Sequence, residues 1–203
     1  MSLATRAVNM LKSPKTEWDV VAAESATTGG LFTGYAVPLS LLSSIASFIS
    51  SAFFASAVLG AFGVVHSTTY FMGTAAIGWV LGLVGLFIAA YVVNMLAPTF
   101  GSTKSDINAM KLVVYANTGS WVGGILNVIP FLGMLGAVAG SIYSIYLFYL
   151  GLPKMMGTPQ EKVVGYLVVS ALVVIVITVV MGSIVTAIGG ALFYSAASSV
   201  RVY

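Results

Sequence analysis

The chain has 203 residues, of which 59% are hydrophobic and only 6% are charged, and its net charge is +3. A soluble domain is usually about a quarter charged, so this composition excludes an ordinary soluble enzyme and indicates an integral membrane protein. The positive charge is small and dispersed, which excludes a nucleic-acid partner. The absence of cysteine excludes disulfides, thiolate metal sites and a nucleophilic thiol.

Residues 1–30 are predicted to form a cytosolic or interfacial N-terminal segment, because their charges interrupt any signal-peptide core. A first short amphipathic helix would place Arg6 and Lys12 away from its apolar side. In a second short helix, Thr16 would be the cap of a capping box and Asp19 would reach back to it. Two locations stay open, the headgroup region of the inner leaflet or a site packed on the bundle. The apolar side is formed by Leu3, Ala7, Val8, Met10 and Leu11.

Three charge-free runs make up most of the remaining chain. No charged residue lies between Glu24 and Lys104, and two further runs cover residues 112–153 and 163–200. About 20 apolar residues in a helix cross the hydrocarbon of a bilayer, which tolerates charge and unpaired backbone poorly. The first run is too long for one helix and is expected to hold two. We therefore predict an all-α polytopic membrane protein with five transmembrane helices, at about residues 35–62, 70–96, 109–127, 131–152 and 163–190.

Polar turns separate these spans. Residues 66–69, which include His66, are expected to form a turn in water, and residues 127–130 a second hairpin turn. Pro38 is expected to set the entry of the first span or to kink it. The Val/Ile-rich run at 172–177 would suit a strand in water, but a lone strand in lipid leaves its backbone unpaired, so a helix is predicted. Residues 31–194 then form the transmembrane domain and 195–203 a short tail.

Basic residues predict the orientation of the chain. With the N-terminus in the cytoplasm, the cytoplasmic segments and adjacent span ends would hold seven of the eight lysines and arginines. The outer turns would hold none, and Arg201 in the tail would be the exception. The positive-inside rule therefore predicts a cytoplasmic N-terminus and an external C-terminus in a bacterial inner membrane.

The order of several short stretches resembles the Yip family, five-span membrane proteins named for their interaction with Ypt/Rab GTPases, and more narrowly its prokaryotic members. The resemblance covers nearly the whole chain and implies the fold and a membrane location. Eukaryotic relatives act in vesicle trafficking and carry an Asp-Leu-Tyr-Gly-Pro type motif that is missing here, so Rab binding is not implied. The matching stretches are PKTEW at 14–18, YAVPL at 35–39, KLVVYANTGSW at 111–121, IPFLG at 129–133, YLFYLGLP at 146–153 and TPQEKVVGY at 158–166.

No catalytic, cofactor-binding or metal-binding constellation is predicted. The chain has one histidine and no Glu-x-x-His or His-x-x-x-His spacing, no Gly-x-Ser-x-Gly elbow and no phosphate-binding loop. Polar residues inside the predicted spans form a candidate track for a solute. Hydrogen bonding between helices is the favoured explanation for them, because no ionisable residue accompanies them. The candidate track consists of Asn94, Asn117, Thr118 and Thr178.

Two further groups of residues are candidates for packing and recognition. Three Gly-x-x-x-Gly pairs would let helices approach closely, within the monomer or between copies; they are Gly78 with Gly82, Gly119 with Gly123 and Gly136 with Gly140. The loop before the last span is a candidate partner surface, because methionine adapts to varied partners. Its members are Lys154, Met155, Met156, Glu161 and Lys162.

These features favour a non-catalytic Yip-like scaffold or adaptor that organises the membrane or partner proteins through its cytosolic face. Its partners would be the lipid bilayer, other membrane proteins or a second copy of itself, and no cofactor is expected. The alternative is a small-solute transporter or channel component that uses the polar track. A lipid-active enzyme or scramblase-like protein is the third and least favoured hypothesis, because the acids, histidines or metal that headgroup chemistry needs are missing from the predicted spans; a lipid groove without chemistry stays open.

Overall fold

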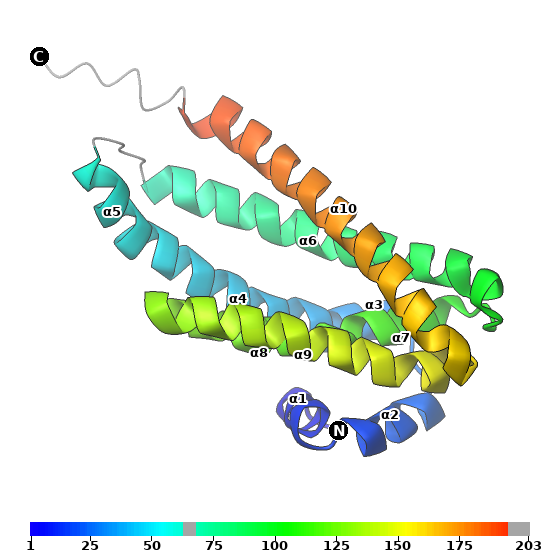
Figure 1. Ribbon diagram of the computed structural model, residues 1–203. Helices are drawn as coiled ribbons and strands as arrows, with labels where there is room; N and C mark the ends of the chain where they lie inside the picture. The colour runs from blue at the N-terminus through cyan, green and yellow to red at the C-terminus, as the bar shows by residue number, and fades with distance from the viewer. Residues whose placement is uncertain (63–67, 195–203) are drawn as a thin grey trace, which may run out of the picture.

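Helices form all the regular structure of residues 1–62 and 68–194, which are the residues that the computed structural model describes, and these ranges contain no strand (Figure 1). The predicted all-α class is therefore confirmed. The Val/Ile-rich run at 172–177 lies inside a helix, as the bilayer argument requires. His66 and the tail at 195–203 lie outside the described residues.

The chain begins with two short helices, α1 (Leu3–Lys12) and α2 (Pro14–Ala23). The predicted capping box at Thr16 is wrong, because α2 already begins at Pro14, two residues earlier. Proline is favoured at a first helical position, where its missing N–H needs no partner and its φ angle already suits the helix. Asp19 consequently lies in the body of α2.

Both short helices pack on the transmembrane bundle. Trp18 of α2 is fully buried, and its Nε1 donates a hydrogen bond of 3.1 Å to the carbonyl oxygen of Leu147. Met10 of α1 is also fully buried, and the hydroxyl of Tyr143 donates to the carbonyl of Leu11 at 2.7 Å. These contacts place both helices against the bundle, which is the second of the two locations that the sequence left open.

The first long helical stretch is built from several consecutive pieces. It begins earlier than predicted because the Thr27 hydroxyl accepts a hydrogen bond from the Gly30 N–H, which caps the first turn. Just before Pro38 the helix widens to a π-turn, in which the Val37 N–H bonds to the Phe32 carbonyl. This turn accommodates a proline that cannot donate. The pieces are α3 (Thr28–Leu31), η1 (Phe32–Ala36), α4 (Val37–Ile49), η2 (Ser50–Ala55) and α5 (Ser56–Ala61).

The second long helix ends in a glycine turn. It comprises α6 (Thr68–Leu96) and the 3-10 turn η3 (Ala97–Phe100), followed by Gly101 with φ of +65°. This left-handed conformation favours glycine and terminates the helix. The loop that follows hydrogen-bonds to the later loop at 157–159, since Ser102 Oγ donates to Thr158 Oγ1 at 2.8 Å.

The predicted third span is broken at Asn117 into α7 (Asp106–Ala116) and α8 (Thr118–Ile125). The Asn117 side-chain amide donates to the Val113 carbonyl, and the Thr118 hydroxyl donates to the Tyr115 carbonyl. Side-chain bonds of this kind compete with the helix's own ladder. The single continuous helix predicted at 109–127 is therefore corrected to two shorter helices.

Each of the last two long helices is a single continuous α-helix. The 3-10 turn η4 (Leu126–Val128) leads into α9 (Pro130–Met156), and η5 (Gln160–Lys162) leads into α10 (Val163–Gly189), which ends in the π-turn η6 (Gly190–Tyr194). Four helical stretches of the described chain are long and apolar enough to cross a bilayer. They are Thr28–Val58, Thr68–Phe100, Phe131–Met156 and Gln160–Phe193.

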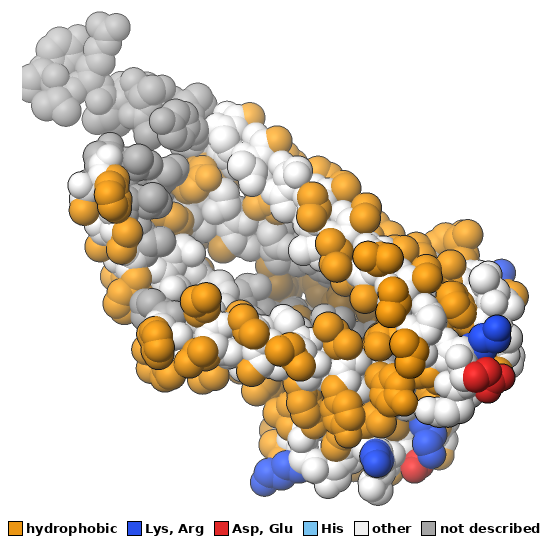
Figure 2. All heavy atoms as spheres, in the orientation of Figure 1, with side chains coloured by type: hydrophobic (Ala, Val, Ile, Leu, Met, Phe, Trp, Pro, Cys, Tyr) orange, Lys and Arg blue, Asp and Glu red, His pale blue; other side chains and the backbone are white. Residues whose placement is uncertain are grey.

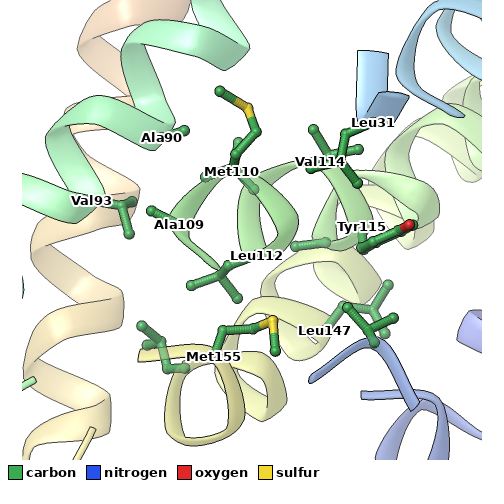
Figure 3. Packing of buried hydrophobic residues seen from close by; sticks show 14 of the residues in the cluster. Leu31, Ala90, Val93, Ala109, Met110, Leu112, Val114, Tyr115, Leu147 and Met155 are labelled. Atoms are coloured by element: carbon green, nitrogen blue, oxygen red, sulfur yellow. The ribbon is translucent and has the colours of Figure 1, made fainter. Parts of the chain in front are cut away.

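Charged side chains gather at one end of this bundle. In Figure 2 the blue and red atoms that are visible lie at the end formed by α1, α2 and the loops before α7 and α10, which we call the charged end. The hydrophobic core lies at the same end, around α7, whose residues 109–116 are all buried. Figure 3 shows side chains of α6 and α9, such as Val93 and Leu147, around Leu112 and Tyr115 of α7.

Candidate functional site

Four charged residues meet where α1, α2 and α7 join, and we call them the ionic junction: Arg6, Glu17, Glu24 and Lys111. Arg6 donates to Glu17 at 2.6 Å and to both carboxylate oxygens of Glu24 at 2.5 Å. Lys111 donates to the backbone carbonyls of Val21, at 2.9 Å, and Glu24. The junction thus joins both N-terminal helices to the most deeply buried helix of the bundle.

Three members of the junction are buried and the Glu24 side chain is 42% exposed, so the buried charges depend on their partners. Arg6 is 6% exposed, Glu17 is 4% exposed and Lys111 is 4% exposed. Burial by itself would lower the pKa of Arg6, but the hydrogen bond and the charge of Glu24 outweigh it and the pKa is raised. The guanidinium therefore stays charged, and removing either partner would leave an uncompensated charge in a poorly hydrated place.

Aromatic and hydroxyl groups continue the junction into the bundle. The Arg6 guanidinium lies 5.6 Å from the ring centre of Tyr115, within cation–π range. The Tyr115 ring in turn lies 4.8 Å from the ring of Tyr35, whose hydroxyl is 2.8 Å from that of Thr118. A hollow of about 440 Å³ borders Arg6, Glu24 and these two tyrosines.

The sequence interpretation missed this junction. It placed Arg6 on the polar side of α1, whereas the structure buries Arg6 and leaves Val8 46% exposed; that assignment is corrected here. Helical periodicity assigns polar side chains to the solvent side of a helix. It contains no information about partners from another segment, such as the two carboxylates that neutralise the inward-facing Arg6. Lys111 was the available signal, because a cation within a predicted span needs a partner.

A second feature is a pocket of about 350 Å³ between α4, α6 and the α7–α8 break. Polar groups of α4 line it, including Ser40, Ser43, Ser44 and Ser47. Trp79 of α6 donates from Nε1 to Ser40 Oγ at 3.0 Å, and Asn117 lies opposite on the broken span. Figure 2 shows the hollow between the helices on this face of the molecule.

The four residues of the candidate polar track do not come together. Asn94 bonds to Asp106 at 2.5 Å and to the Ser105 N–H at 2.8 Å, near the charged end. Thr118 is fully buried, and its hydroxyl lies next to that of Tyr35. Thr178 is exposed on α10, and its hydroxyl donates a hydrogen bond to the Val174 carbonyl. Only Asn117 lines the pocket.

The three glycine pairs occupy two different environments. Gly119 and Gly123 of α8 lie against Gly140 and Gly136 of α9, so close that a Cβ on Gly119 would be 2.7 Å from the Gly140 carbonyl oxygen. In contrast, Gly82 has no neighbouring atom within 4 Å of a built Cβ, and it lines the pocket with Gly78.

The candidate partner surface is only partly exposed. Met155 is 4% exposed and Met156 is completely buried, so both belong to the core (Figure 3). Their assignment to a surface is corrected, because the apolar side chains fill space beside α7. Lys154, Glu161 and Lys162 are exposed, and Lys154 forms an ion pair with Asp19 of α2.

The fold defines an integral membrane protein with an all-helical transmembrane bundle. The described residues contain no cluster of three or more histidine or acidic side chains that could hold a metal ion. A family model described as the Yip1 domain matches residues 8–198. The chain therefore belongs to the Yip1 domain family, as the sequence resemblance indicated. No curated protein and no solved structure matches it.

Proposed function

We propose that this protein is a non-catalytic scaffold or adaptor of the membrane, which organises partner proteins or copies of itself through its charged end. The observation that carries the proposal is the ionic junction, which joins α1 and α2 to each other and to α7. An attached pair of helices presents a preorganised surface, so less ordering entropy is lost on binding. The exposed charges of Lys154, Glu161 and Lys162 lie at this same end.

A charge swap at the proposed surface tests the adaptor role. The double variant Glu161→Lys with Lys162→Glu keeps the net charge but reverses the local pattern. We expect crosslinked complexes in native lipid to fall about tenfold or more, equivalent to ~1.4 kcal/mol of binding. Met134→Ala, exposed at the opposite end, is the control and should change nothing. Finding neither a partner nor self-association for the wild-type protein would overturn the proposal.

We further propose a topology of five crossings with a cytoplasmic N-terminus in a bacterial inner membrane. The broken pair α7–α8 would be the third crossing, because Gly119 and Gly123 lie against α9 in antiparallel order and Leu112 lies beside Gly151. Backbone irregularity inside a membrane is acceptable where protein surrounds it. The gathering of basic residues at the charged end supports this orientation.

Cysteine labelling can test this topology directly, since the chain has no native cysteine. Thr103→Cys lies in an exposed loop of the charged end, and Val128→Cys lies in the exposed turn before α9. A membrane-impermeant maleimide should label Val128→Cys in intact cells and Thr103→Cys only after the membrane is opened. Labelling of both positions from the same side would contradict the third crossing.

A further inference from the structure

The pocket between α4, α6 and the α7–α8 break lies in the middle of the spanning helices. Ser43 and Ser44 are central in the stretch Thr28–Val58, and Gly82 is central in the stretch Thr68–Phe100. At this depth the surrounding solvent is hydrocarbon, where an unpaired hydroxyl or amide is costly. The polar groups that line a cavity at this depth therefore need a molecule inside the cavity with which they can form hydrogen bonds.

Several hydroxyls elsewhere in the spanning helices bond to their own backbone, whereas Ser170 of α10 is buried without a hydrogen-bond partner among the described residues. The side chains of Ser56, Thr74, Thr178, Ser183 and Thr186 each donate to the carbonyl one turn back in the same helix. This is the ordinary arrangement for serine and threonine in a membrane helix. It requires nothing from a neighbouring helix or from a ligand.

Polar groups in the pocket are paired only in part, since Ser40 accepts from Trp79 and Ser47 accepts from Asn127. Ser43 and Ser44 make no side-chain hydrogen bond with any residue of the described ranges. The side-chain NH₂ of Asn117 donates a hydrogen bond to the Val113 carbonyl. The side-chain oxygen of Asn117 has no donor among the described residues. These two hydroxyls and the amide oxygen belong to residues that line the pocket, with the Ser43 hydroxyl beside Gly124 of α8, and they can bond to a molecule that both donates and accepts.

The chemistry of the walls narrows the class of that molecule. No charged residue lines the pocket, so an ionic group would lose its hydration without a counter-charge. Trp79, Trp121, Leu83 and Leu86 supply apolar surface beside the polar groups. The volume of about 350 Å³ is within the usual range of ligand sites and equals roughly ten water molecules.

We propose that this pocket binds a neutral polyhydroxyl group through Ser43, Ser44 and Asn117. The group can belong to an uncharged membrane lipid with a glycerol or sugar head, or to a free polyol. A lipid would reach the pocket from the bilayer, because Leu41, Leu42 and Ile45 on the same helix are exposed. This inference is independent of the adaptor role proposed above.

Glycine substitutions offer a matched test of the pocket. Leucine at Gly82 would fill it, since no atom lies within 4 Å of the built Cβ there. Gly182→Leu is the control, because Gly182 of α10 is exposed and equally free of neighbours. Both variants add the same side chain to a membrane helix, so only the pocket distinguishes them. Ser43→Ala with Ser44→Ala removes the hydroxyls without filling the space.

Binding is measured with the full chain in phosphatidylcholine nanodiscs, with either dioleoylglycerol in the bilayer or free glycerol in the buffer. Native mass spectrometry reports retained dioleoylglycerol, and tryptophan emission reports occupancy beside Trp79 and Trp121 in both arms. The wild-type protein and Gly182→Leu should respond equally. Gly82→Leu should lose the response, and the double serine variant should bind about tenfold more weakly.

The two arms identify the source of the polyhydroxyl group. Retention of dioleoylglycerol with no response to glycerol assigns the pocket to a lipid, and the reverse assigns it to a free polyol. The proposal is overturned if neither probe produces a response, which would leave a pocket filled by water only. It is also overturned if Gly82→Leu and Gly182→Leu retain dioleoylglycerol equally while circular dichroism shows both folded.

Discussion

The charged end and the middle of the bundle are packed in opposite ways, although the helices of the charged end are the less apolar ones. Around α7 every residue from 109 to 116 is buried, whereas α4 and α6 enclose a polar pocket in mid-span. In lipid, apolar side chains gain little by leaving their surroundings. Tight packing therefore depends on specific contacts, such as the ion pairs and hydrogen bonds of Arg6 and Lys111 at the charged end.

The largest expected effect of a single substitution is at Trp18, which anchors the packed end. Trp18→Ala removes a fully buried ring and its bond to Leu147, so we expect the free energy of unfolding to fall by about 3–5 kcal/mol. Phe131→Ala removes an aromatic ring that is 77% exposed and should change it by less than about 0.5 kcal/mol. Denaturant titration in mild detergent measures both. Equal losses would contradict the contrast between the two regions.

Breaking the ionic junction should have the next largest effect. Arg6→Gln leaves the buried Glu17 without its cation, and removal of one partner of a buried pair costs about 3 kcal/mol or more. The exposed Lys12 of the same helix is the matched control, and Lys12→Gln should be close to neutral. Protease sensitivity of the N-terminal helices, followed together with thermal unfolding, checks the prediction. An Arg6→Gln protein as resistant as wild type would show that the junction does not attach them.

Two glycines of the same sequence pattern should respond differently to alanine. At Gly119 the new methyl group would lie 2.7 Å from the Gly140 carbonyl oxygen, and such overpacking costs about 1–3 kcal/mol. At Gly82 the methyl group meets no atom within 4 Å, and alanine should raise helix stability by up to about 1 kcal/mol. Thermal unfolding of the two variants gives the sign of each change. Destabilisation at Gly82 similar to that at Gly119 would mean that the pocket is closed in the membrane.

The smallest expected effect is that of the surface ion pair between Lys154 and Asp19. Both side chains are about half exposed, at 47% and 59%, and pairs of this kind contribute about 0–1 kcal/mol. Lys154→Gln should therefore shift the unfolding midpoint only slightly, and less so at high salt. A loss as large as that of Arg6→Gln would show that the packed end extends to this surface.

Sequence reasoning predicted the helical class, the membrane location and four helices close to their observed positions. It predicted the third span as a single helix, because residues 112–127 carry no charge and hydropathy does not register the side-chain bonds of Asn117 and Thr118. The start at Thr28 was also missed, since a threonine cap contributes little to hydropathy.

Candidate site residues were harder to predict than helices. Asn117 was identified as a polar residue at membrane depth, and it lines the pocket. Ser43 was not identified, because nothing in its immediate sequence distinguishes it from Ser56, which bonds to its own helix. Met155 was assigned to a surface because it lies near a loop, but α7 covers it.

By itself, the sequence determined that the chain is an integral, helical membrane protein of the Yip1 domain family with its charge near particular helix ends. Charge and hydropathy are summed along one segment and need no knowledge of its neighbours. Only the tertiary structure decided that Arg6 points inward, that Gly119 meets Gly140 while Gly82 faces a pocket, and that Ser43 lacks a partner. Those outcomes depend on which helix faces meet, a property of several segments at once.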